Sequence, residues 1–165
     1  MFRRLIRTQR DFAALVLRLT MAVVIFPHGA QKALAWFGGP GPAKALQGFQ
    51  GMGIPRPLGG LDILAEFAGS ILLVFGLLGR VAAFGIGVAM LTAIALVHQA
   101  NGFFMNWTGR QPGEGFEYHL LVIGIAIAIM IRGSGAWSID RAMSRPNLPR
   151  LSEERRPQSG PARAA

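Results

Sequence analysis

LGGLDILAEFAGSILLVFGLL, residues 58–78, is the stretch that decides the fold. It is almost wholly apolar, and its length matches the roughly 20 residues that an α-helix needs to cross the hydrocarbon core of a bilayer. Two carboxylates, Asp62 and Glu66, interrupt it four residues apart, which places both on one face of a helix. The stretch therefore predicts a membrane-spanning helix that carries an acidic face.

Three other stretches are also long and mostly apolar, namely Phe12–Ala30, Val81–His98 and Tyr118–Ile131. The last is short, so it is expected to borrow flanking residues or to meet a thinner part of the bilayer. The chain has 165 residues, of which 52% are hydrophobic, and this is too apolar for an ordinary soluble domain. We predict an all-α integral membrane protein with a four-helix bundle in residues 1–141. Residues 142–165 are rich in Pro, Arg and Ser and predict a disordered basic tail.

The basic residues predict the topology. The chain has a net charge of +9, and twelve of its Lys and Arg residues fall before the first span, between the second and third, or after the fourth. The two longer loops hold only four, Lys32, Lys44, Arg56 and Arg110. By the positive-inside rule, both termini then lie in the cytoplasm and the longer loops outside, as in a multi-pass protein of a bacterial inner membrane. This distribution is also unlike the single basic face of a nucleic-acid-binding protein.

The first longer loop predicts a short helix. Turn residues fill Trp36–Pro42, after which Ala43, Leu46 and Phe49 share one helical face until Gly51 and Gly53 end the pattern. Such a short amphipathic segment is expected to lie in the membrane interface. The preceding Ala33–Ala35 imitates a signal-peptidase site, but cleavage there would place the Arg-rich tail outside, against the charge pattern. We therefore expect the first span to stay attached.

The chain contains no cysteine. Disulfides, thiolate metal ligands, cysteine redox relays and covalent c-type haem attachment are therefore excluded. Any redox role would depend on a bound cofactor or substrate.

Three histidines lie where apolar segments meet the same side of the membrane. His28 is near the end of the first segment, His98 ends the third, and His119 is near the start of the fourth. Each alone could be a polar cap, but ionisable groups at a bilayer are costly and often functional. Together with Glu66 they predict a shared polar pocket in the outer half of the bundle. The other candidate residues of this pocket are Arg18, Gln31, Asn101, Glu117 and Tyr118.

Glu66 and Arg18 lie deepest and allow two interpretations each. Glu66 either makes a structural hydrogen bond to a neighbouring helix or exchanges protons with a bound substrate. Arg18 either extends to the inner interface or faces the interior of the bundle. In the second case it would hold Glu66 ionised or bind an anionic substrate.

Imidazole and carboxylate groups could serve several ligands. They could bind a transition metal, ligate a haem, or form hydrogen bonds to the carbonyl groups of a quinone. No H-E-x-x-H spacing occurs, and Glu117, Tyr118 and His119 are adjacent and so point to different faces, which makes metal binding the weaker alternative. We therefore expect a polar pocket for a redox-active or lipidic small molecule. The Gly38–Gly41 turn lacks the lysine and the following helix of a phosphate-binding loop.

At these positions the chain resembles the DoxX family of four-span bacterial and archaeal membrane proteins. The resemblance covers nearly the whole chain up to about Arg141. The matching stretches are Leu17–Leu19, Phe26–Lys32, Trp36–Gly41, Glu66–Gly69, His98–Phe104, Gly113–His119 and Trp137–Asp140.

The resemblance implies a compact four-helix membrane fold and a membrane redox role. The family takes its name from an archaeal thiosulfate:quinone oxidoreductase, and similar members are linked to membrane redox complexes of oxidative-stress defence. The leading hypothesis is thus a subunit of a redox system, working with soluble or membrane-bound redox partners. In it Glu66, His28 and His98 would handle protons and the other candidate residues would bind a quinone-like molecule. The alternatives are a non-catalytic scaffold that recruits redox or stress-defence enzymes and a small transporter.

Overall fold

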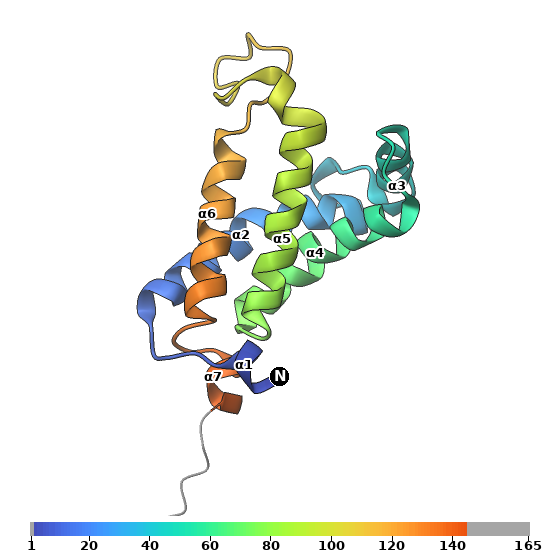
Figure 1. Ribbon diagram of the computed structural model, residues 1–165. Coiled ribbons are helices and arrows are strands. Elements are labelled where there is room, and N and C mark those ends of the chain that lie inside the picture. The colour runs from blue at the N-terminus through green and yellow to red at the C-terminus, as the bar shows by residue number, and fades with distance from the viewer. Residues whose placement is uncertain (1, 145–165) are drawn as a thin grey trace, which may run out of the picture.

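The computed structural model describes residues 2–144, and all of their regular structure is helical. Figure 1 shows four long helices, which are α2 Phe12–Leu34, α4 Arg56–Phe75, α5 Gly79–Ala93 and α6 Glu117–Arg132. The shorter elements are α1 Phe2–Ile6, η1 Trp36–Gly38, α3 Gly41–Gly51, η2 Ile94–His98, η3 Gln99–Asn101 and α7 Ile139–Ser144. The predicted all-α class is confirmed. The predicted disordered tail lies outside the described residues from 145 onward.

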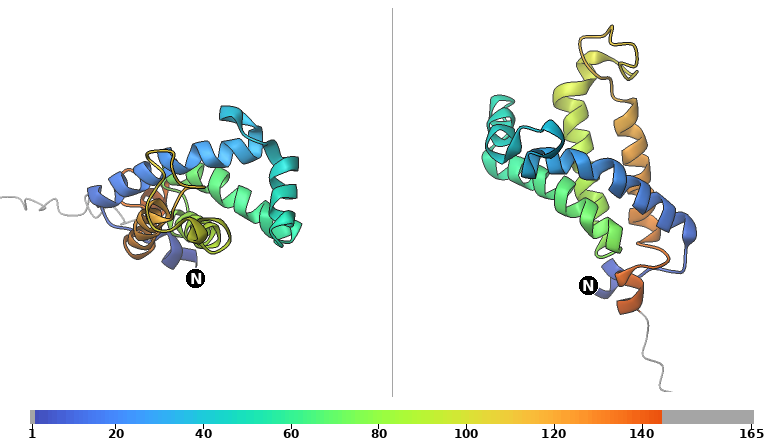
Figure 2. Two further views of the ribbon diagram at one scale, coloured as in Figure 1. Left: turned by 90° about the horizontal axis from the view of Figure 1, so that it is seen from above. Right: turned by 180° about the vertical axis from the view of Figure 1, so that it is seen from behind.

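The long helices form two antiparallel pairs. Helix α2 packs along α4, and α5 packs along α6, while α4 also contacts α5 and α2 contacts α6. Figure 2 shows that the first pair crosses the second steeply, an arrangement that the sequence prediction of a four-helix bundle did not specify. Helices α4 and α5 diverge from the tight turn at residues 76–78, and α3 lies at the open end of the resulting V (Figure 1).

Apolar side chains fill the crossing point of the four helices. Met21 and Ile25 of α2, Leu73 of α4, Ile86 of α5 and Ile129 of α6 are all buried there. Large apolar side chains also cover the outward faces, and the residue Val23, for example, is 69% exposed. Such a continuous apolar exterior suits contact with lipid and not with water.

Three of the helical segments in residues 2–144 are long and apolar enough to cross a membrane. These are Phe12–Leu34, Arg56–Phe75 and the continuous rod Gly79–Asn101. Helix α6 has 16 residues, which gives about 24 Å at 1.5 Å per residue and falls short of a ~30 Å hydrocarbon core. The fourth apolar segment is thus shorter than the others, as predicted. That α6 crosses the membrane stays a prediction.

The two ends of the described chain lie together. Helix α1 contacts α7, and both are at the same end of the molecule, below the α4–α5 turn in Figure 1. This matches an even number of crossings. The side of the membrane that this end faces stays a prediction from the charge pattern.

The predicted short helix of the first longer loop is α3. It begins at Gly41, whose φ of +72° is the left-handed conformation that glycine adopts readily, and Pro42 occupies its first turn. A Cβ on Gly59 of α4 would lie 2.8 Å from the Phe49 ring, so Gly59 lets α3 pack closely on the start of α4. The placement of α3 in the membrane interface stays a prediction.

Candidate functional site

A buried ion cluster joins α2 to α4. The Lys32 ammonium lies 2.8 Å from Asp62 Oδ2, to which it donates a hydrogen bond, and 2.8 Å from Glu66 Oε2. The side chain of Glu66 is 5% exposed, that of Asp62 14% and that of Lys32 26%. We call these three residues the Lys32–Asp62–Glu66 triad. It contains two carboxylates for one ammonium, so it has room for one additional proton or for a ligand that donates hydrogen bonds.

Close packing of two backbones sets the position of the triad. A Cβ on Gly29 of α2 would lie 2.5 Å from the Phe67 backbone nitrogen of α4, which no side chain could tolerate. Glycine alone therefore lets the helices approach here, as small residues do between membrane helices. Lys32 follows Gly29 by one turn, and Glu66 precedes Phe67, so this contact brings the ammonium to the carboxylates.

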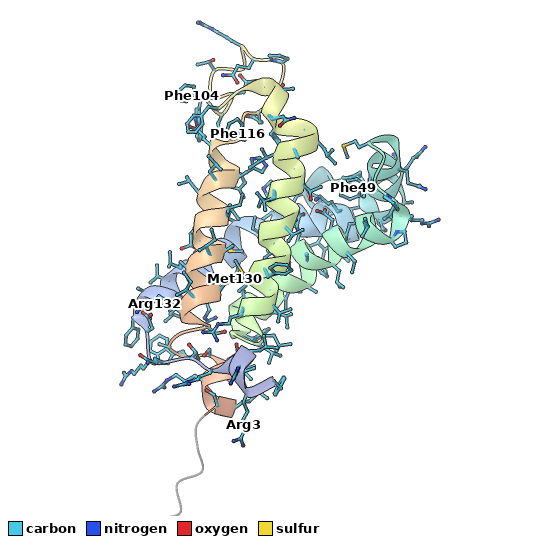
Figure 3. All side chains as sticks on the ribbon, viewed as in Figure 1. Arg3, Phe49, Phe104, Phe116, Met130 and Arg132 are labelled. Carbon is cyan, nitrogen blue, oxygen red and sulfur yellow. The ribbon has the colours of Figure 1, made fainter. Side chains whose placement is uncertain are left out.

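The triad opens into a cavity between α3, α4 and α5. The cavity has a volume of about 280 Å³. Its polar lining groups are Thr92 and His98 of the α5 rod and the triad itself, and the rest of the lining is apolar. Phe49 of α3 (labelled in Figure 3) closes one side, with its ring centroid 5.3 Å from the Lys32 ammonium. A mostly apolar hollow with a few convergent polar groups is typical of small-molecule sites.

The three histidines and Tyr118 form a second cluster beside this cavity. The His98 and His119 rings are in contact, with centroids 4.1 Å apart, and the His28 ring lies 6.3 Å from that of Tyr118. Within residues 2–144, neither the buried Tyr118 hydroxyl nor the buried His119 Nδ1 has a hydrogen-bond partner. Unpaired buried polar groups are uncommon and often mark a place where a water or ligand binds.

His98 connects the histidine cluster to the cavity. It lies in a single π-helical turn, Ile94–His98, that extends α5, and such turns occur frequently at functional sites. Its Nδ1 is 2.8 Å from the Glu114 carbonyl oxygen. Because a carbonyl only accepts, Nδ1 must donate, which leaves Nε2 as an acceptor in the neutral ring. His98 thus offers Nε2 as a hydrogen-bond acceptor at the wall of the cavity.

Three predicted binding residues make local bonds instead of lining the cavity. Glu117 Oε1 accepts from the Met105 backbone N–H at 2.9 Å, and so it holds the loop before α6. Asn101 Nδ2 donates to the Glu114 carbonyl at 3.1 Å, and Gln31 Nε2 donates to the Phe37 carbonyl at 3.3 Å. The structure therefore gives these side chains a role in the loops.

The expected role of Arg18 must be corrected. Arg18 is buried, as one of the two interpretations required, but it lies toward the other end of α4, away from Glu66. Its guanidinium donates five hydrogen bonds, to the carbonyls of Leu73, Val74, Ser134, Ala136 and Trp137. All its donors are therefore used to join the C-terminal end of α4 to the segment after α6, and Lys32 is the cation beside Glu66.

Lys32 and Asp62 are the site residues that the predicted pocket did not include, although the sequence predicts that Asp62 shares a helical face with Glu66. Lys32 was counted as a charge of the outer loop, although the structure places it inside the last turn of α2. The available signal was spacing, since Lys32 follows His28 by four residues and Asp62 precedes Glu66 by four. Two such pairs on adjacent antiparallel helices indicate that the polar faces meet.

The described residues do not assemble a metal centre. Among residues 2–144, no group of three His, Asp or Glu side chains is close enough to hold a metal ion. The His98–His119 contact comprises two imidazoles only. Within the cavity, Lys32 can donate hydrogen bonds, and Asp62 and Glu66 can accept them.

Comparisons with known proteins show which proteins the chain resembles. The sequence profile of the DoxX family matches residues 13–99, and every residue that lines the 280 Å³ cavity lies in that range. The chain is also 31% identical over 136 residues to the inner membrane protein YqjF of Escherichia coli K12. That alignment covers 82% of this chain and 95% of the relative. No solved structure matches the chain.

Proposed function

The chain belongs to the DoxX family of integral membrane proteins, and we propose that it binds a quinone or a similar small molecule as a subunit of a membrane redox system. The observation that carries this proposal is the Lys32–Asp62–Glu66 triad, which faces a cavity of about 280 Å³. Buried ionisable groups in membrane helices are expensive, and they usually mark a substrate or proton pathway.

The triad suits the hydrogen-bonding pattern of a quinone. The Lys32 ammonium has three donors, of which two face carboxylates, so one remains for a ligand carbonyl. The carboxylates can accept from the hydroxyl groups of the reduced ligand. One ligand oxygen would therefore interact with the triad in both redox states. In the oxidised ligand it accepts from the Lys32 ammonium, and in the reduced ligand its O–H donates to a carboxylate.

Named groups of the site would exchange protons with the ligand. Reduction of a quinone to a hydroquinone takes up two electrons and two protons. The electrons would come from a reduced partner protein of the redox system. Glu66, at the wall of the cavity, and His98, in contact with His119, are the groups placed to exchange the protons.

The same family and the charges support a location. We place the protein in the bacterial inner membrane with both termini in the cytoplasm. The excess of basic residues near the termini supports this, as does the contact of α1 with α7 at one end of the molecule. The printed name of the relative from Escherichia coli also describes an inner membrane protein.

Co-purification tests the proposal directly. The protein would be extracted gently from its native membrane and its bound small molecules identified by mass spectrometry, for wild type, Glu66→Gln and Glu114→Gln. Glu114 is an exposed carboxylate of the loop and serves as the matched control. We expect a stoichiometric quinone in wild type and in Glu114→Gln, and its loss in Glu66→Gln. Equal quinone content in all three proteins, or none in wild type, would contradict the proposal.

A further inference from the structure

A second and larger hollow follows the outer face of α4 and α5. It has a volume of about 780 Å³ and runs along the V that these two helices form (Figure 1). Its walls are apolar, with Leu61, Ala65 and Ala68 on α4 and Gly85 and Val88 on α5. We call this hollow the α4–α5 groove. It lies on the exterior that faces lipid, because Leu61 and Val88 are exposed.

The groove adjoins the cavity of the triad. Four residues line both of them, Ile54, Asp62, Ala89 and Thr92. The groove therefore has one polar region, where the Asp62 carboxylate that bonds Lys32 lies. From Asp62 the groove continues along α4 to Leu72, ten residues further, which is about 15 Å at 1.5 Å per residue.

This shape fits a molecule with a polar head and one hydrocarbon chain. The polar side chains, Asp62 and Thr92, are confined to one region, and the remaining length offers only apolar contacts. A helix of another protein is a poorer fit, because it would bring no group into the cavity beyond Asp62. We infer that the ligand is such an amphiphile, whose head lies at the triad and whose chain lies in the α4–α5 groove, so that it enters sideways from the bilayer. This inference rests on the proposed function of the same cavity.

The groove provides a route more than it provides affinity. Inside a bilayer the chain is already among hydrocarbon, so its transfer into the groove gains no hydrophobic free energy. Affinity then comes mainly from the head at the triad, whereas the groove decides whether a chain-bearing molecule can place its head there. Filling the groove should therefore exclude ligands with a chain and spare the same head without one.

A pair of probes separates these contributions. One is a substituted benzoquinone with a decyl chain, and the other is the same head without the chain. Binding would be measured in lipid nanodiscs by equilibrium separation and mass spectrometry, for wild type, Ala68→Phe and Val88→Phe. Val23→Phe, on the lipid-facing side of α2 and outside both hollows, is the matched control.

The two groove variants are expected to weaken binding of the decyl probe about tenfold or more, which corresponds to about 1.4 kcal/mol or more. The chainless probe should bind all four proteins equally. Unchanged binding of the decyl probe to both groove variants, or equal weakening of both probes, would overturn the inference and leave the proposed function standing. Failure of both probes to bind wild type would remove the proposed function itself.

Photolabelling keeps the inference testable if the variants fold poorly. A diazirine near the end of the decyl chain would label wild-type protein, and digestion would identify the labelled peptides. Labels on α4 and α5 between residues 61 and 88 support the inference. Labels confined to α2 or α6 would overturn it, and so would a phospholipid that stays bound in the groove when the decyl probe is saturating.

Discussion

The Lys32 ammonium holds together two carboxylates that would otherwise repel each other. Its nitrogen lies 2.8 Å from a carboxylate oxygen of each of Asp62 and Glu66, in a region only partly exposed to water. A buried charge that loses its partner costs far more than the pair contributes when complete. The triad is therefore sensitive to single substitutions, and this sensitivity can be used to test it.

Lys32→Met should destabilise the protein by about 3 kcal/mol, because it leaves two adjacent carboxylates without a cation. The double variant Lys32→Met with Glu66→Gln should recover part of this loss, since one of the two acids is then neutral. Thermal unfolding in detergent measures both effects. If the losses of the two single variants simply add in the double variant, the two residues are not coupled.

Arg18 of α2 is a second buried cation, and it contacts the other end of α4. Arg18→Ala leaves the carbonyls of Leu73 and Trp137, among others, without donors in an apolar setting. We expect a loss of about 3 kcal/mol or more, and only a partial recovery with Arg18→Lys, whose ammonium cannot reproduce the planar fork. Arg3→Ala, at an exposed position, is the control. Unchanged ligand binding in any Arg18 variant that still folds would agree with its structural role, whereas specific loss of binding would restore the substrate role expected from the sequence.

Asp11 gives a pH dependence with a defined sign. The Arg132 guanidinium, which donates a hydrogen bond to its carboxylate, lowers the pKa of Asp11 from the ordinary value of 3.8. Because the pKa is lower in the folded state, the unfolded chain binds the proton more readily. The stability from this pair is thus complete above the ordinary pKa and is lost as the pH falls below it.

The difference in unfolding temperature between wild type and Asp11→Asn should therefore be present near about pH 6 and shrink as the solution is acidified to about pH 3. Asn keeps a side-chain acceptor for the Ala14 N–H that Asp11 caps, so the comparison isolates the charge. A difference that does not change over this range would show that the ion pair contributes nothing.

At the level of the elements, the contact between α2 and α4 controls the geometry of the site. Gly29 meets the backbone of α4 directly, and the triad lies one turn further along α2. Any side chain at residue 29 would push the two helices apart and separate Lys32 from the carboxylates. A substitution that moves α2 away from α4 should therefore also disrupt the triad.

Gly29→Ala is expected to destabilise the protein by about 1–3 kcal/mol and to weaken ligand binding. Gly124→Ala on α6 is the control, because a Cβ there meets nothing within 4 Å. It should leave both properties unchanged, or raise stability slightly through better helix propensity. A Gly29→Ala protein with normal stability and normal binding would show that the close approach of the helices is not needed.

At the scale of the whole molecule, hydropathy located the helices but not their pairing. The long apolar runs around Leu73, Met21 and Ile86 predict helices without any knowledge of tertiary structure. The steep crossing of the two pairs depends on where small residues such as Gly29 and Gly85 meet their neighbours. One sequence does not show which glycine faces which helix.

The site was predictable only in part, because one sequence does not show which helices are paired. Glu66 and His98 stand out because acids and histidines are rare in apolar runs, and both line the cavity. The partner of Glu66 was assigned wrongly, because depth along a helix was judged without the helix pairing. Arg18 lies in a span and attracted attention, whereas Lys32 lies in the last turn of its helix and resembled an ordinary loop charge.

Topology is tested by reporter fusions. A fusion at Gln111 should report the outer side of the membrane, and fusions at Phe2 and at Ala165 should both report the cytoplasm, because the basic residues gather near the termini. Alkaline phosphatase and green fluorescent protein give opposite signals on the two sides. Termini on opposite sides would mean that α6 does not cross the bilayer.

The central claim is that the Lys32–Asp62–Glu66 triad binds the head of the ligand. Equilibrium titration of the chainless benzoquinone against wild type, Glu66→Gln and Glu114→Gln in nanodiscs tests this claim most directly. The account predicts saturable one-site binding to wild type and Glu114→Gln, and at least about tenfold weaker binding to Glu66→Gln, as expected for the loss of a hydrogen bond to a charged group. Equal dissociation constants for all three proteins would contradict it.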